Sequence, residues 1–491
     1  MTPLPTRRRW LVATLSLALL AGCASGPTHD EKLPIVFVHG NGDTAALWLT
    51  TVWRFESNGW PRERLHAIDL PYPLARDADD KAQDGRTSTQ EHMHLLNAEV
   101  DQVVRRTGAS RVVLMGNSRG GYAIRNYIAN GGGAAKVSHA ILGGVPNHGV
   151  WANPTFRPTS EFNGAGPFLT ALNNQGGAGI EVTPGVKWLT IRSDNNDKFA
   201  QPDGLWIGAK GTPTNVSFAG PELKGAENAV IAGIDHRETS FSARAFSAAH
   251  SFITGHKPSV ETIQAETRVA LAGKVTGQGL ANRAGTGNFV NNLPLAGATV
   301  EVYATDATTG ERLGAALHRQ TVDATGLWGP LQTNSKAALE FVISAPGFAT
   351  THIYRSPFAR SSNWVHLRAE RVADADRDAA ALVTLTRPRG YFGVPRDDIS
   401  LDGQSPPAGI NSGVAGCRWH ARALPTRRHA PWWANSMASA SLVAPGPQGP
   451  TTSFCWSCTI DHLDARFASR CGCGCGCGCG CGKILNQAPQ R

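Results

Sequence analysis

Residues 112–128 read Val-Val-Leu-Met-Gly-Asn-Ser-Arg-Gly-Gly-Tyr-Ala-Ile-Arg-Asn-Tyr-Ile: an apolar run, a glycine-flanked serine, then a helical pattern. Gly116 and Gly120 frame Ser118 in a G-x-S-x-G pentad, and glycines there let the backbone turn sharply from a strand into a helix without a Cβ clash. A serine on such a turn projects its hydroxyl from the carboxyl end of a sheet. The stretch therefore predicts a strand-turn-helix unit with Ser118 as a candidate nucleophile.

The surrounding sequence, residues 33–258, alternates short apolar runs with helical patterns, which predicts an α/β domain with a mostly parallel sheet and helices on both faces. Ser88 and Glu91 form a capping box for one helix, and Gly108 is placed to end it. The runs expected as buried strands are residues 35–38, 65–68, 112–115, 140–142, 186–191 and 230–232.

After a polar linker at residues 259–267, the pattern changes to strand-like alternation broken by turns, which predicts a small all-β sandwich with a trailing loop over residues 268–416. The remaining residues, 417–491, contain Cys471 to Cys481 in strict alternation with glycine. This segment is interpreted as a low-complexity tail without regular structure, or as an aberrant C-terminus. The expected strands of the sandwich are residues 269–271, 299–303, 339–343, 364–367 and 382–385.

The N-terminus has the layout of an export signal. Three arginines at positions 7–9 precede an apolar run, and Leu20-Ala21-Gly22-Cys23 follows it. This sequence resembles the lipobox of bacterial lipoproteins, in which Cys23 is lipidated after cleavage, and the arginines loosely resemble a twin-arginine signal. We expect a signal peptide at 1–22, a linker at 23–32, and an exported protein, either an envelope lipoprotein of the outer membrane or a secreted one. An ordinary signal peptide with an incidental Cys23 is the alternative.

Charge and cysteine content exclude several classes. The net charge of +9 comes entirely from the arginines at 7–9 and from eight basic against two acidic residues beyond 416, so the central part is neutral and nucleic-acid binding is not expected. No cysteine lies between Cys23 and Cys417, so no disulfide holds the predicted α/β domain. The Cys455/Cys458 pair has no partner ligands at zinc-site spacing, and no metal is expected.

Acyl transfer through a serine requires a base, an acid that orients the base, and two donors for the oxyanion. His39-Gly40-Asn41-Gly42 follows the first predicted strand, so the amide of Asn41 is the candidate first donor and the amide of Arg119 the second. The flanking glycines, Gly40 and Gly42, allow the Asn41 amide to face a ligand. A simple strand-ending turn is the alternative for His39-Gly40.

The candidate base is His236, which follows the last predicted strand and precedes the helical pattern of residues 243–253. It comes last in the chain, as the order serine, acid, histidine requires. Asp197 is chosen as the acid because it follows the strand that ends at Ile191. Asp194 and Asp203 lie in the same loop and stay open as alternatives, since any of the three could be a turn or cap residue.

These blocks resemble the α/β-hydrolase superfamily, and within it the small secreted bacterial triacylglycerol lipases. The resemblance implies Ser118 as nucleophile, Asp197 as acid, His236 as base, and the Asn41 and Arg119 amides as oxyanion hole. Many of these lipases have His and Met on either side of the serine, where this chain has Asn117 and Arg119. A charged Arg119 beside the nucleophile could favour a polar or anionic group on the substrate.

Two further regions bear on specificity. Residues 149–185 form a long insertion with several aromatic residues, expected to be a lid or a wall of an acyl pocket, or else a surface helix packed by Phe168 and Leu172. In the second domain, Leu271-Ala272-Gly273-Lys274-Val275 and residues 293–302 and 323–328 resemble the prealbumin-like, carboxypeptidase-regulatory-like sandwich. Such a module would present a lipid or polymer substrate, or space the enzyme from a membrane.

Together these features predict an exported serine hydrolase of carboxylic esters, a lipase or esterase, that uses an acyl-enzyme and no cofactor. Its expected partners are an ester, lipid or polyester substrate and, through Cys23, a membrane; we expect a monomer. A polyester depolymerase with the same triad is the alternative within the class. A catalytically dead surface binding protein is the alternative from another class.

Overall fold

The computed structural model describes residues 32–491 except 176, 178, 221, 278–279, 282–287, 290, 308–309, 370–380, 388–389, 398, 402–404, 407–418, 425–431, 437–441, 444–451 and 458–491. The predicted signal peptide, Cys23 and the alternating segment Cys471 to Cys481 lie outside the described residues. Within them, no helix has both the length and the apolar character needed to cross a bilayer.

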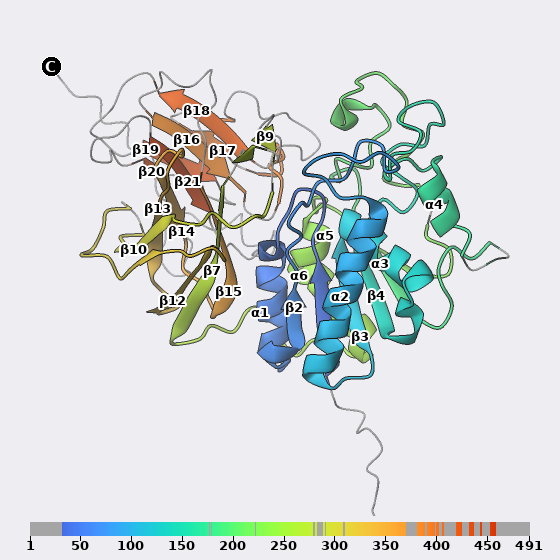
Figure 1. Ribbon diagram of the computed structural model, residues 1–491, viewed down its shortest axis with the longest axis horizontal. Helices are drawn as coiled ribbons and strands as arrows, with labels where there is room; N and C mark the ends of the chain where they lie inside the picture. Colours follow the sequence, from blue (N-terminus) through green and yellow to red (C-terminus); the bar gives the residue numbers. More distant parts are fainter. Residues whose placement is uncertain are drawn as a thin grey trace, which may run out of the picture. The chain divides into compact units, whose positions relative to one another are not determined.

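A six-stranded parallel sheet organises the first part of the chain (Figure 1). Its strand order is β2-β1-β3-β4-β5-β6, so the chain begins in the interior of the sheet, steps outward to β2 and returns past β1 to β3. Ligands of such sheets bind outside the carboxyl ends of the strands, where the order reverses, which here is between β1 and β3. The strands are β1 Ile35–Val38, β2 Leu65–Ala67, β3 Val112–Asn117, β4 Val137–Gly143, β5 Lys187–Arg192 and β6 Glu227–Val230.

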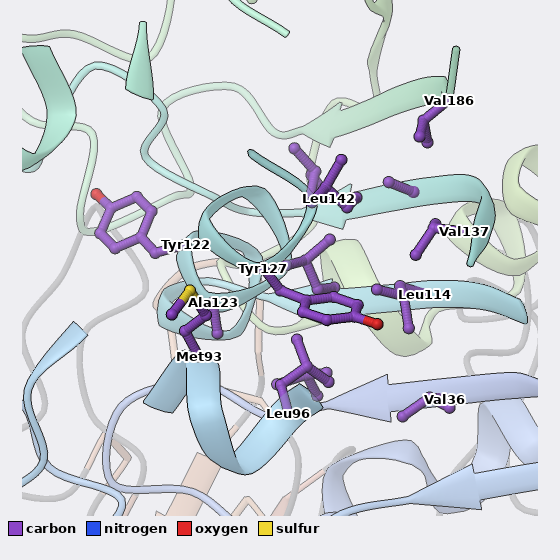
Figure 2. Close-up of a cluster of buried hydrophobic side chains, with 14 of the residues drawn as sticks. Val36, Met93, Leu96, Leu114, Tyr122, Ala123, Tyr127, Val137, Leu142 and Val186 are labelled. Atoms are coloured by element: carbon purple, nitrogen blue, oxygen red, sulfur yellow. The ribbon is translucent and has the colours of Figure 1, made fainter. Parts of the chain in front are cut away.

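Both faces of the sheet are covered by helices, as predicted. Val36 and Val38 of β1 point into a core shared with α2 (Thr89–Thr107) and α3 (Arg119–Asn130), which Figure 2 shows in close-up. Ile35 and Phe37 point to the other face, where α1 (Leu49–Ser57) and α6 (Ala243–Thr254) pack. The alternation follows from the two-residue period of a strand. Because helices cover both faces, every residue of β1 is fully buried.

Local signals position these elements well, with one exception. Ser88 and Glu91 form the capping box of α2, and Gly108 ends that helix with φ +68°. The last strand differs: residues 230–232 were expected to form a buried strand, but β6 covers Glu227–Val230, and the Val230 side chain is 55% exposed. β6 is an edge strand that pairs only with β5 among the strands of this sheet, so it needs no fully apolar run.

The remaining helices of this part are η1 Ala45–Trp48, η2 Arg62–Arg64, η3 Gly133–Ala135, α4 Pro167–Leu172, η4 Leu205–Ile207 and α5 Glu238–Phe241.

The second part of the chain is built of β-sheets, as the alternating pattern predicted. A three-stranded sheet in the order β12-β7-β15 and a seven-stranded sheet in the order β11-β10-β13-β14-β21-β16-β18 share a core that includes Leu271, Trp328, Phe341 and Val365. The strands are β7 Val269–Gly277, β8 Leu280–Ala281, β9 Asn288–Phe289, β10 Thr299–Thr305, β11 His318–Thr321, β12 Leu327–Thr333, β13 Ala338–Ser344, β14 Thr351–Arg355, β15 Ser362–Ala369 and β16 Ala381–Thr386.

The predicted tail differs from expectation. Residues 417–491 were expected to lack regular structure, but strands occur among the residues described there, and β21 pairs in parallel with both β14 and β16. Its partners lie far back in the chain, for example Thr351 opposite Ser453 and Ala381 opposite Thr452, and local composition does not reveal such pairing. The strands beyond residue 416 are β18 Trp419–Leu424, β19 Trp432–Ser436, β20 Leu442–Val443 and β21 Thr452–Ser457; β17 Ile399–Leu401 precedes them.

Candidate active site

Ser118 lies on a strained turn between β3 and α3. Its backbone has φ +51° and ψ −123°, a combination that non-glycine residues rarely adopt, and its amide donates a hydrogen bond to the Gly143 carbonyl at 3.0 Å. The pentad glycines allow the close packing behind it. A Cβ on Gly120 would lie 2.4 Å from the Val38 carbonyl oxygen, and one on Gly116 would lie 2.8 Å from the Gly121 nitrogen. The turn thus holds the serine at the carboxyl end of β3, as the sequence predicted.

The structure brings His236 and Asp197 together. Nδ1 of His236 lies 2.9 Å from each carboxylate oxygen of Asp197, and both residues are buried. The Phe199 ring packs against the imidazole with its centroid 4.6 Å away. If Nδ1 carries the proton that the carboxylate accepts, Nε2 has a free lone pair. Within the described part of the chain, this Nε2 is buried and has no hydrogen-bond partner.

Ser118 and the His236 loop both flank the end of β4. The Ser118 amide bonds to Gly143, while a Cβ on the next residue, Gly144, would lie 3.3 Å from Nδ1 of His236. Asn117, the residue before the serine, links the two sides, because its Nδ2 donates to Gly143 O at 3.1 Å and to His236 O at 3.3 Å. In the sequence Asn117 stands out only as a departure from the lipase pattern, and no local signal predicts this linking role.

The two alternative acids occupy other positions. Asp194 accepts hydrogen bonds from the Gly233 amide at 3.0 Å and from Ser193 and Asn196, so it ties its loop to the one that carries His236. Burial alone would raise the pKa of Asp194, but these hydrogen bonds outweigh burial and lower it. Asp203 accepts from the Leu205 amide at the start of η4. Of the three candidates, only Asp197 contacts the imidazole.

The loop after β1 lies beside the serine. A Cβ on Gly40 would be 3.1 Å from the Ser118 Cβ, and Gly42 has φ +69°, which a larger residue would adopt only with strain. The Asn41 side chain is anchored, since its Oδ1 accepts from the Ala75 amide at 2.7 Å. Nε2 of the buried His39 accepts from the Leu70 amide, and burial lowers the pKa of His39, which favours its neutral form. The loop is therefore fixed beside Ser118.

Arg119 corrects one expectation. Its side chain is fully buried and does not face a substrate: Nε lies 2.6 Å from Oε1 of Glu161, and Nη2 lies 3.0 Å from Oε2. Nη1 also donates to the Pro73 carbonyl. The charge is thus neutralised inside the protein, so it offers no selection for a polar or anionic substrate group.

The insertion at 149–185 supplies Glu161 and packs onto the domain. In α4, Leu169 and Leu172 are buried in the core shared with α2 and α3, and Phe168 packs against the Tyr122 ring at 5.9 Å. This agrees with the packed-helix alternative for α4 and not with a lid there.

A pocket adjoins the site on the side of Asp197. Asp197 and Gly144 contribute to its wall, and polar groups such as Arg192 and Asn147 also line it. Its apolar lining consists of Val145, Pro146, Phe199, Ala200, Val216, Phe218 and Leu223. Among the described residues, no group of three or more His, Cys, Asp or Glu side chains is placed to hold a metal ion.

Comparison with known proteins agrees with this fold. Residues 35–270 match a family model described as alpha/beta hydrolase family, and residues 267–372 match one described as lipase C-terminal domain. The chain therefore belongs to the α/β-hydrolase superfamily through its first domain and carries a lipase C-terminal domain after it. For the second domain, the sequence motifs resemble a prealbumin-like sandwich, whereas the matching family model is described as a lipase C-terminal domain.

Individual relatives are distant. A non-heme haloperoxidase from Rhodococcus erythropolis is 28% identical over 136 residues, which are 27% of this chain and 44% of that protein. The match thus spans less than half of the relative's length. A Bacillus licheniformis lipase in its propeptide form is 14% identical with a TM-score of 0.33, over 84% of this chain and 91% of that one. A Legionella pneumophila phospholipase is 12% identical with a TM-score of 0.32, over 70% and 95%. Similarity this low says nothing about the substrate.

Proposed function

We propose that this hydrolase cleaves carboxylic esters as a lipase or esterase, with Ser118 as nucleophile, His236 as base and Asp197 as the acid that orients the base. The observation that carries the proposal is the two-oxygen contact of Asp197 with Nδ1 of His236, which leaves a buried Nε2 without a partner in the described residues. The histidine loop is linked to the proposed nucleophile, because Asn117, which precedes Ser118 on its strained turn, donates to the His236 carbonyl at 3.3 Å. An imidazole held this way by a carboxylate is poised to remove a hydroxyl proton.

The mechanism follows from these positions. His236 takes the Ser118 proton as the serine oxygen attacks the ester carbonyl, and the amides of Asn41 and Arg119 donate to the oxyanion. His236 then gives the proton to the leaving alcohol, and an acyl-enzyme remains. Water, deprotonated by His236, attacks the acyl-enzyme and releases the acid. Asp197 stabilises the imidazolium in both halves and stays ionised.

The substrate class rests on two supports. The wall of the adjoining pocket includes apolar side chains such as Val145 and Phe199, which would contact an acyl chain, beside polar ones such as Arg192. The second domain matches the lipase C-terminal model, which accords with an acyl-ester substrate. We also propose, from the sequence alone, that residues 1–22 direct export and that Cys23 carries a lipid anchor.

The test compares the full chain with Ser118→Ala on chromogenic esters of graded acyl length. We expect turnover by the wild type and a loss in the variant of about 10⁶-fold, the size found when a triad serine is removed. Ser110→Ala, a substitution at an exposed serine, is the matched control and should keep wild-type rates. Equally negligible turnover in wild type and Ser118→Ala would instead favour a binding protein.

A further inference from the structure

A short segment that follows β16, Arg387 together with residues 390–397, packs against the loop that carries His236; we call it the brace. It lies beyond both matched family models, which end at residues 270 and 372. We propose that Arg387 and Arg396 of the brace are positioning residues, which hold the His236 loop in the geometry that activates Ser118. The inference rests on the proposed function.

The contacts are direct and charged. Arg387 bridges the two carboxylates that bracket His236, with Nη1 2.6 Å from Asp235 and Nη2 2.8 Å from Glu238. Arg396 reaches the same pair, at 3.1 Å from Glu238 and 3.5 Å from Asp235. The brace backbone takes part as well, since the Tyr391 amide donates to Oδ2 of Asp235 at 2.8 Å.

Burial makes these contacts necessary. The Asp235 and Glu238 side chains are at most 1% exposed, and burial, followed by the nearby charge of Glu238, raises the pKa of Asp235. Two buried carboxylates this close repel each other unless cations compensate them. Without the two arginines, the loop could relieve the repulsion by moving a carboxylate toward water. Because Asp235 precedes His236 directly in the chain, that movement would displace the imidazole.

The brace also reaches the acid loop. The Tyr391 ring lies 6.4 Å from the Phe199 ring, which itself packs on His236, and the Lys198 ammonium lies 3.9 Å from the centre of the Tyr391 ring. A Cβ on Gly390 would lie 2.7 Å from Asp235 Oδ2, so the backbone approaches the carboxylate closely. The brace therefore contacts both loops that supply the His236–Asp197 pair.

The opposite side of the histidine loop is anchored independently. Arg237 forms a buried ion pair with Asp43, which follows the candidate oxyanion loop. Asn292, from the second part of the chain, donates to the Asp43 carbonyl at 2.8 Å. The loop is thus fixed on one side by Asp43 and on the other by the brace, and loss of the brace should shift His236 without releasing the loop completely.

The experiment measures how fast a fluorophosphonate probe labels Ser118 in the full chain, because this rate reports activation of the serine without any choice of ester. We expect Arg387→Ala to label about 10- to 100-fold more slowly per folded molecule, the range that a displacement of up to about 1 Å can cause. With a turned-over ester, kcat should fall by a similar factor while KM changes little. Arg387→Lys keeps a positive charge but lacks the planar guanidinium that contacts both carboxylates, so it should be labelled at an intermediate rate. Arg396→Ala should lose less labelling rate than Arg387→Ala.

Arg312→Ala is the control, since Arg312 forms an ion pair with the buried carboxylate of Glu340, 2.6 Å apart, inside the second domain. It should cost stability but keep the wild-type labelling rate, and thermal melting fixes the folded fraction of each variant. If Arg387→Ala and Arg396→Ala are labelled at the wild-type rate, the positioning role of the brace is overturned, while the proposed function is unaffected. No labelling of the wild type at Ser118 would remove the proposed function, and the inference with it.

Discussion

Arg119, the residue after Ser118, and Glu161, from the insertion, form a two-point ion pair in which neither side chain is more than 1% exposed. The two residues are 42 positions apart in the chain, so the pair fastens the insertion to the first turn of α3. It also accounts for a charged residue beside the proposed nucleophile, where a charge facing the substrate had been expected.

Removal of the acid from this pair should destabilise the protein strongly. Glu161→Ala leaves the Arg119 guanidinium buried without its counter-charge, and breaking a buried pair in this way costs about 3–5 kcal/mol. We expect that loss in the free energy of unfolding measured with urea. Asp101→Ala, which breaks the half-exposed contact with Lys136, is the control and should cost about 1 kcal/mol or less. Equal urea midpoints for Glu161→Ala and the wild type would contradict the structural role.

The choice of acid can be tested by comparing three variants on one ester. Asp197→Ala should lower kcat by about 10⁴-fold, because the imidazole loses the carboxylate that fixes its tautomer and stabilises its charge. Asp203→Ala should stay near the wild-type rate, since the Asp203 carboxylate accepts from the Leu205 amide and does not contact the imidazole. Asp194→Ala should fall between them, because it unties the acid loop from the Gly233 turn. A loss in Asp203→Ala with a normal Asp197→Ala would reverse the assignment.

The sequence predicts those parts of the molecule that local chemistry encodes. The strained turn at Ser118 follows from two glycines next to an apolar strand, and the start and end of α2 follow from Ser88, Glu91 and Gly108. The turn and the helix ends are each specified within a few neighbouring residues. The α/β-hydrolase fold was expected from the resemblance of these blocks, taken in their order along the chain, to that superfamily.

Long-range features are a different matter. Nothing local separates Asp197 from Asp194 and Asp203, since only the folded path of the loop brings one of them to His236. The contact of Arg387 with Asp235 joins residues 152 positions apart, in a segment that looked like a trailing loop. Buried charge pairs of this kind leave no periodic pattern in a single sequence, because each partner alone resembles an ordinary surface charge.

The second domain makes the stability dependent on pH. Glu340 accepts hydrogen bonds from His352 and Arg312, each at 2.6 Å. Burial alone would raise the pKa of Glu340, but these partners outweigh burial and hold it below the usual 4.5. A lowered pKa in the folded state means that the unfolded chain binds the proton first as the pH falls. The stability from Glu340 is therefore full above pH 4.5 and is lost as the pH falls through the folded-state pKa.

Glu340→Gln removes this titration, so its free energy of unfolding should fall less steeply than that of the wild type below pH 4.5. The difference in slope should reach at most about 1.4 kcal/mol per pH unit, the value for one proton. Urea unfolding of both proteins at several pH values, from about pH 3 to about pH 6, measures this difference in slope. Parallel pH curves for the two proteins would show that Glu340 is not the group responsible.

The backbone of Ser118 should make the site a source of instability. Its φ of +51° with ψ of −123° is costly for any residue with a Cβ, by about 1–3 kcal/mol, while glycine adopts it freely. Glycine also gives the unfolded chain more freedom, which offsets about 0.4–1 kcal/mol of the gain. We therefore expect Ser118→Gly to unfold at a higher urea concentration than Ser118→Ala, with a net difference of about 1 kcal/mol, although both variants lack activity.

Ser110→Gly and Ser110→Ala supply the reference pair, because Ser110 is exposed and its backbone has an ordinary negative φ. There the glycine variant should be the less stable of the two, by about 0.5–1 kcal/mol. We expect the glycine variant to be the more stable one at position 118 and the less stable one at position 110. Because all four variants lack the hydroxyl, such a reversal would report backbone strain and not the loss of that group. If glycine is the less stable residue at position 118 as well, the turn is not strained, and the serine is held in place by its contacts alone.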